Sequence, residues 1–202
     1  MVENMKLGIW DYFVYLMTGV ALFLIIAAHC MLGNALTIEQ IMEVPAAVLV
    51  TSLVMAFLLL GMLIEPMANL LFKLVASKPN TWRDKLGFKQ WDRSIEGMEK
   101  EARILVPESM QSATFAFAKN WVLINGNSSE FQAFLSKYGF YRSIAFVFAV
   151  NAIACLVFHW LWQGVSGCVV SALLCVLYSY RASVFYRHMS VSIFNQFVQG
   201  HR

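Results

Sequence analysis

The sequence predicts an all-helical integral membrane protein with four transmembrane helices and a helical cytoplasmic insert. Two long stretches without Lys or Arg carry this prediction, residues 7–72 and residues 143–180. A hydrocarbon core of about 30 Å needs about 20 apolar residues of helix, so each stretch has the length of two crossings. Hydrophobic residues make up 59% of the chain and its mean hydropathy is +0.63, which excludes an ordinary soluble domain.

The placement of the basic residues predicts the orientation of these helices. Eleven of the fifteen Lys and Arg residues lie at 73–142, between the two apolar stretches. Lys and Arg mark the cytoplasmic ends of membrane helices, so this block and both termini are expected inside the cell. The expected regions are a first transmembrane hairpin (1–75), a cytoplasmic helical insert (76–138), a second transmembrane hairpin (139–187) and a cytoplasmic helical tail (188–202).

The first two transmembrane helices are expected at about 10–32 and 45–64. Pro45 suits the first turn of a helix, where its missing N–H would have no intrahelical partner. Glu65-Pro66 then predicts a kink, because proline inside a helix removes a hydrogen bond. The amphipathic continuation at 67–75 is therefore expected to leave in another direction.

The cytoplasmic insert is predicted to form two amphipathic helices. Apolar residues at three- and four-residue steps predict the first helix over 88–105, and Val106-Pro107 ends it. The second helix ends at Asn125-Gly126, and Asn127 to Glu130 is typical of a capping box. The predicted apolar stripe of the second helix comprises Met110, Ala113, Phe117, Trp121 and Ile124.

No turn signal separates Glu130 from Trp160, so one long helix is expected to begin in the cytoplasm and continue as the third transmembrane helix, at about 143–162. Gln163–Gly167 is predicted as a short hairpin, which makes the third and fourth transmembrane helices antiparallel neighbours. The fourth is expected from Cys168, and its helix continues past Arg181 with an apolar stripe at Tyr186, Met189, Ile193 and Phe197.

Acidic residues at membrane depth are the candidate ion pathway: Glu65, Asp11, Glu39 and Glu43. Ionisable groups in membrane helices are costly and usually face a bundle interior or water. Repeated around a symmetry axis, each carboxylate becomes an acidic ring that favours cations. The alternative is that Asp11 and Glu65 are solvated at the membrane surface, or paired with Lys6 and Lys73.

Two further polar groups are singled out by their positions. Asn151 lies in the middle of the third transmembrane helix, where its amide is expected to bond a neighbouring helix or chain. Arg181, Arg187 and His188 follow the fourth helix and are candidate contacts for a phosphate-bearing ligand at the inner surface. Contact with lipid headgroups is the alternative for these three residues.

Enzyme and metal signatures are absent from the sequence. No serine-hydrolase, metalloprotease, Walker or dinucleotide motif occurs, so no enzyme activity, catalytic residue, cofactor or metal is expected. Residues 73–142 carry eleven Lys and Arg against seven Asp and Glu, too mild an excess to predict direct nucleic-acid binding. The many aromatic residues of the insert need a surface that buries them. Packing against identical copies would provide one, so a homo-oligomer, with a tetramer as the expected size, is predicted.

The stretch from Ser129 to Arg142 and the tail from Tyr180 to Met189 resemble the membrane subunit of the Hailong anti-phage defence system of bacteria. That resemblance implies an oligomeric ion channel in the bacterial inner membrane, controlled by the nucleotide product of a companion nucleotidyltransferase. The layout also resembles the membrane subunit of the Kiwa defence system, a tetrameric four-span protein docked to a soluble partner. Two functions therefore stay open: a gated channel or pore-forming effector, or a non-conducting sensor or scaffold that anchors and regulates a soluble effector.

Overall fold

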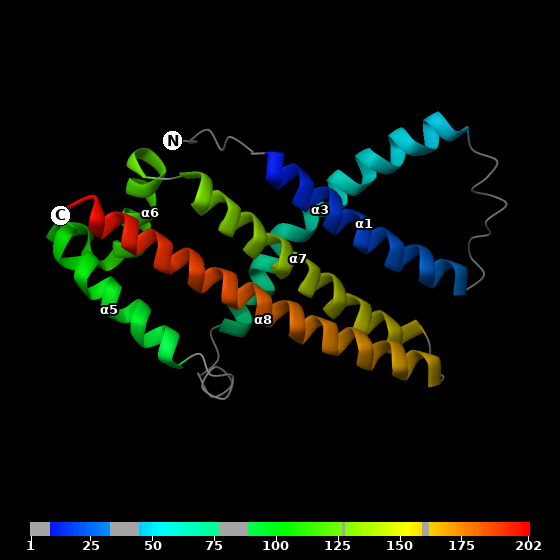
Figure 1. The fold of residues 1–202 in the computed structure, drawn as a ribbon. Helices are drawn as coiled ribbons and strands as arrows, with labels where there is room; N and C mark the ends of the chain where they lie inside the picture. Colours follow the sequence, from blue (N-terminus) through cyan, green and yellow to red (C-terminus); the bar gives the residue numbers. More distant parts are fainter. Residues whose placement is uncertain (1–8, 33–44, 77–88, 127, 159–161) are drawn as a thin grey trace. The chain divides into compact units, whose positions relative to one another are not determined.

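The computed structural model describes residues 9–32, 45–76, 89–126, 128–158 and 162–202, and these residues form helices and turns with no strand (Figure 1). This confirms the all-helical prediction for the described part of the chain. Four segments are long and apolar enough to cross a membrane: Tyr12–Met31, Ala46–Phe72, Glu130–Val157 and Gly164–Gln199. The helices are α1 (Ile9–Leu32), α3 (Ala46–Ala76), α5 (Lys89–Leu105), the 3-10 helix η1 (Glu108–Ala113), α6 (Thr114–Asn125), α7 (Ser128–Phe158) and α8 (Trp162–Gln199).

The chain divides into two compact units. The apolar unit comprises Met1–Leu74 and Gly139–Arg181, and the aromatic unit comprises Val75–Tyr138 and Ala182–Arg202. Helices α7 and α8 each contribute residues to both units. The long helix predicted from Glu130 onward is therefore present as α7.

Helix pairs in the apolar unit run antiparallel. Between α1 and α3, Gly61 faces Tyr15 and Gly19 faces Phe57, so the contacts advance along one helix as they recede along the other. Between α7 and α8, Asn151 bonds Ser171 and the Phe148 and Tyr178 rings stack 5.6 Å apart. The antiparallel arrangement predicted for the last two apolar helices is confirmed.

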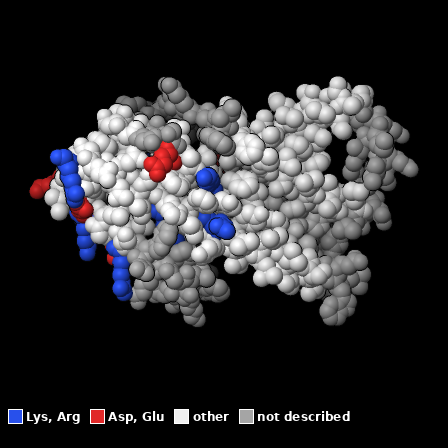
Figure 2. All heavy atoms as spheres, viewed as in Figure 1, with Lys and Arg blue, Asp and Glu red and all other residues white. Residues whose placement is uncertain are grey.

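Figure 2 shows a wide uncharged surface on the apolar helices.

One predicted boundary in the apolar unit is wrong. Helix α3 runs through Glu65-Pro66 to Ala76, so the predicted continuation at 67–75 belongs to the same helix, with Pro66 inside it. The predicted hairpin Gln163–Gly167 forms the first turns of α8 instead. In these turns Gly167 lies close to α7, since an added Cβ there would be 3.0 Å from the Cys155 sulfur.

The aromatic unit has one core, and the end of α8 completes it. Ile193, Phe194 and Phe197 of α8 are at most 1% exposed. They pack with residues of α5, of the bend that follows it, of α6 and of α7, which are Ala102, Val106, Ala118, Val122 and Phe131. The described aromatic residues of this core thus have cover within the same chain. The core itself does not require identical copies, and the homo-oligomer stays a prediction.

The buried stripe of α6 differs in part from the predicted one, of which Phe117 and Trp121 do pack against the core. Thr114, Ala118 and Val122 are buried, whereas Met110 is 50% exposed and Ile124 is 80% exposed. Residues 108–113 form the 3-10 helix η1 rather than α-helix. A 3-10 helix has 3.0 residues per turn, so the phase of the α-helical stripe does not carry across η1.

Candidate functional site

Glu65 is the centre of a polar cluster that joins three helices of the apolar unit. The Tyr15 hydroxyl of α1 donates a hydrogen bond of 2.6 Å to Glu65 Oε2. The Arg142 guanidinium of α7 lies 3.6 Å from Glu65 Oε1. The Arg142 side chain is 7% exposed and that of Glu65 is 38% exposed. This set of residues is named the carboxylate cluster.

The carboxylate cluster changes the expected chemistry of Glu65. A guanidinium beside a carboxylate offsets its charge, and the attraction is stronger in apolar surroundings than in water. Glu65 therefore does not present a bare carboxylate in this structure. The alternative prediction paired Glu65 with Lys73, whereas the described partners are Arg142 and Tyr15.

The other three candidate acids are not placed by the structure. Asp11 belongs to α1, but its side chain lies outside the described residues. Glu39 and Glu43 also lie outside them. Glu65 is thus the one acid of the predicted ion pathway whose surroundings are defined.

Asn151 is the centre of a second polar cluster, which joins α1, α7 and α8. Asn151 Oδ1 lies 2.8 Å from His29 Nε2, and Asn151 Nδ2 donates to Ser171 Oγ at 2.7 Å. With the amide in this orientation, the His29 Nε2–H donates to Asn151 Oδ1. Ser171 is 3% exposed. This set is named the amide cluster.

The two clusters occupy different levels of the apolar unit. Tyr15 and His29 are fourteen residues apart on α1, about 21 Å along the helix axis at 1.5 Å per residue. Buried polar groups stabilise an apolar helix bundle only when they are hydrogen-bonded, and the Tyr15–Glu65, His29–Asn151 and Asn151–Ser171 bonds supply such partners across helices. Sequence reasoning singled out Glu65 and Asn151 but missed Tyr15, Arg142, His29 and Ser171 as their partners.

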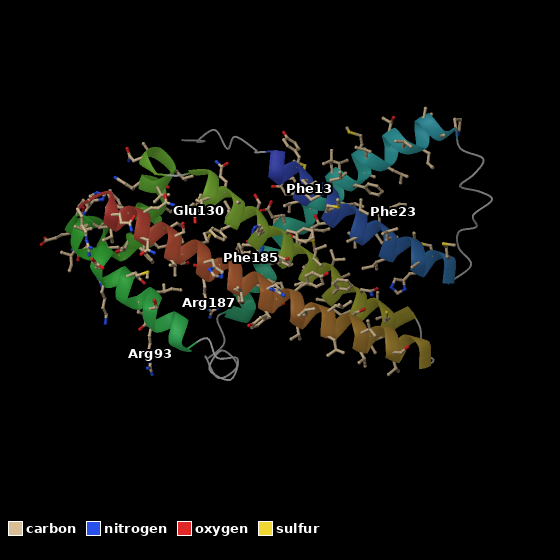
Figure 3. The ribbon with its side chains drawn as sticks, viewed as in Figure 1. Phe13, Phe23, Arg93, Glu130, Phe185 and Arg187 are labelled. Carbon is tan, nitrogen blue, oxygen red and sulfur yellow. The ribbon has the colours of Figure 1, made fainter. Side chains whose placement is uncertain are left out.

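The three candidate phosphate contacts on α8 have different surroundings. Arg187 is buried, and its Nη1 donates to the Ser183 carbonyl at 3.2 Å (Figure 3). His188 is exposed and its ring stacks on that of Phe134, with centroids 6.0 Å apart. Arg181 is exposed as well. Seven residues are close to two helical turns, so Arg181 and His188 share one face of α8 and Arg187 lies on another.

Within the described ranges, no three His, Cys, Asp or Glu side chains gather as a metal site would require. Comparison with known proteins gave no relative: no protein-family model, curated protein or solved structure matches this chain. The function is therefore inferred from the two polar clusters and from the helices that carry them.

Proposed function

We propose that this protein is an oligomeric ion channel or pore-forming effector of bacterial anti-phage defence in the inner membrane, with a homo-tetramer as the expected assembly. In this proposal a nucleotide signal or a soluble partner acts on the cytoplasmic helices and thereby opens the channel. The observation that supports it best is that α7 and α8 each carry both core residues of the aromatic unit and polar-cluster residues of the apolar unit.

Helix continuity supplies the proposed coupling. Phe131 and Arg142 lie on α7, and Ser171 and Phe194 lie on α8. A helix transmits a rotation or shift along its length, because its backbone hydrogen bonds hold neighbouring turns together. Repacking of the aromatic core would thus shift Arg142 and Ser171 against their partners.

The carboxylate cluster is the proposed gate. Held by Arg142 and Tyr15, the Glu65 carboxylate is compensated and attracts cations weakly. A shift of α7 that withdraws Arg142 would leave an acidic group beside the conduction path. Repeated by symmetry, such groups favour the passage of cations.

A non-conducting sensor or scaffold is the second candidate, and a specific observation favours it. Among the described residues of the apolar unit, the polar side chains named above are already engaged with one another across helices. A bundle of this kind can anchor a soluble effector without a water-filled path. The two candidates differ in whether any form of the protein carries current.

Cation flux into proteoliposomes tests the gate. Arg142→Gln removes the cation beside Glu65, so basal cation flux is expected to rise above that of the wild type. The double variant Glu65→Gln/Arg142→Gln also lacks the Glu65 carboxylate, so its cation flux should fall back to the wild-type level. Mass measurement in mild detergent verifies that each variant assembles. If the wild type and Arg142→Gln then both give the same flux as empty liposomes, the scaffold function is favoured.

The same pair of residues is expected to be coupled in stability. Glu65→Gln leaves the buried Arg142 guanidinium without its carboxylate, so unfolding in mild detergent should become easier. The double variant should recover much of that loss, which corresponds to a coupling energy of about 0.5–3 kcal/mol. Additive losses in the two single variants would show that the ion pair does not contribute.

The proposed orientation has a separate test. Reporter fusions at Gly126 and at the C-terminus are expected to read cytoplasmic, and a fusion at Asn34 is expected to read external. The physical reason is the excess of Lys and Arg at 73–142. A periplasmic reading at Gly126 would reject the proposed topology.

A further inference from the structure

One surface of the aromatic unit pairs cationic side chains with aromatic rings across α7 and α8. The Lys137 ammonium of α7 lies 5.6 Å from the centroid of the Phe185 ring of α8. One turn away, the Phe134 ring of α7 stacks on the His188 ring of α8, with an angle of 13° between the planes. Phe134, Lys137, Phe185 and His188 are named the cation–aromatic face. Lys137 and His188 are both exposed.

Helices α7 and α8, which carry this face, contain four Lys and Arg and a single acid, Glu130 near the start of α7. Residues 131–202 contain five Lys and Arg and no Asp or Glu at all. Glu130, the last acid of the chain, accepts a hydrogen bond of 3.4 Å from Gln196, two turns beyond His188 on α8. The buried guanidinium of Arg187 adjoins the face along the chain. An anion that approaches Lys137 therefore meets more positive than negative charge on these two helices.

The face also lies close along the chain to the apolar segments of both helices. Lys137 precedes the Lys- and Arg-free stretch that begins at residue 143 by six residues, about 9 Å of helix. The headgroup layer of a bilayer is about 5–8 Å thick on each side of the hydrocarbon. A cation so placed beside a membrane helix is within reach of lipid phosphates, and a Lys side chain adds further reach.

We propose that the cation–aromatic face binds the phosphate of an anionic phospholipid of the surrounding leaflet. Lys137 supplies the charge and an ammonium donor, and His188 supplies a ring N–H donor. The Phe134 and Phe185 rings hold these two groups side by side and offer an apolar surface to the glycerol and upper acyl chain. The proximity to the apolar segments favours a lipid over a soluble phosphate, and the proposal does not depend on whether the protein conducts ions.

Thermal unfolding in neutral detergent tests the proposal. Added phosphatidylglycerol is expected to raise the unfolding temperature of the full-length protein more than the same amount of phosphatidylcholine. The difference should shrink in about 1 M salt, where the Debye length is about 3 Å. Lys137→Gln should lose most of the phosphatidylglycerol effect, and retention of this lipid in native mass spectrometry should fall about fivefold. Lys137→Arg should keep both responses.

Lys119 provides a matched control. Its ammonium lies 5.8 Å from the Phe131 ring, so it makes the same kind of contact in the same unit, but on α6. Lys119→Gln is expected to keep the phosphatidylglycerol effect, and an equal loss in both variants would overturn the proposed site. Equal stabilisation of the wild type by the two lipids would overturn it without any variant. Equal stabilisation by soluble glycerol phosphate would assign the face to a soluble ligand instead.

Discussion

Gly61→Ala is expected to destabilise the apolar unit by about 3 kcal/mol, the upper end of the usual cost of overpacking. A Cβ at Gly61 would lie 2.0 Å from the Tyr15 carbonyl oxygen. Gly19 of α1 makes the reciprocal contact with α3, since a Cβ there would lie 1.8 Å from the Phe57 carbonyl oxygen. The obstructing atoms are backbone in both cases, so a rotamer change cannot relieve the overlap. The two helices would have to separate.

The reciprocal contact explains why the separation is costly. Each glycine directs a Cα hydrogen at the facing carbonyl, and such C–H···O contacts contribute about 0.5–1 kcal/mol each. In a lipid environment apolar side chains gain little from facing one another, so close backbone packing at small residues dominates helix association. The rings of Phe23 and Phe57, 5.2 Å apart beside this crossing, would also lose contact.

Thermal unfolding in mild detergent measures the effect, and two other glycines serve as controls. A Cβ added at Gly97 or Gly139 meets nothing within 4 Å. Alanine at Gly97 should therefore be neutral or stabilise α5 by about 0.5–1 kcal/mol. Gly19→Ala and Gly61→Ala together should cost less than the sum of the two, because one separation relieves both overlaps. Wild-type stability in Gly61→Ala would contradict the close crossing.

Phe197→Ala is expected to destabilise the aromatic unit by about 3–5 kcal/mol. Phe197 is fully buried, and it forms T-shaped contacts with Phe117 at 5.9 Å and Trp121 at 5.7 Å. Its truncation removes aromatic contacts made by α6 and the end of α8 at once. The cavity would lie at the point where the C-terminal turns of α8 complete the core.

Pulse proteolysis of the full-length protein across a urea series would report this loss as a lower midpoint for cleavage in the aromatic unit. Ile104→Ala is the control, because Ile104 is 81% exposed and its truncation should change stability by no more than about 0.5 kcal/mol. Equal midpoints for Phe197→Ala and the wild type would show that the end of α8 is not part of a cooperative core.

Sequence patterns along one helix predicted much of the architecture. The two Lys- and Arg-free stretches predicted four apolar helices of spanning length, and the structure has them. The steps of three and four residues predicted α5 with the correct face, since Ala102 is buried and Ile95, Met98 and Leu105 pack against the core. These features depend on helical periodicity and segment length, which are properties of neighbouring residues.

The predicted topology also contained a signal for the carboxylate cluster. Glu65 at the end of the second apolar helix and Arg142 at the start of the third were expected at the same inner level. Opposite charges at one level of an apolar bundle tend to pair, since an unpaired charge there is costly. A shared depth in the membrane does not by itself decide the pairing, because each helix can rotate about its axis and turn its side chain toward another neighbour.

The sequence by itself determined that this protein has four apolar helices, an α-helical insert and a basic block that sets its expected orientation. Only the tertiary structure decided that Arg142 and Tyr15 meet Glu65, that His29 and Ser171 meet Asn151, and that the end of α8 covers the aromatic core. The physical reason is the separation along the sequence over which each interaction acts. Periodicity and hydropathy act between residues a few positions apart, whereas these contacts join residues that are distant in sequence. Such contacts depend on how helices rotate and pack once close crossings such as that of Gly19 and Gly61 have formed.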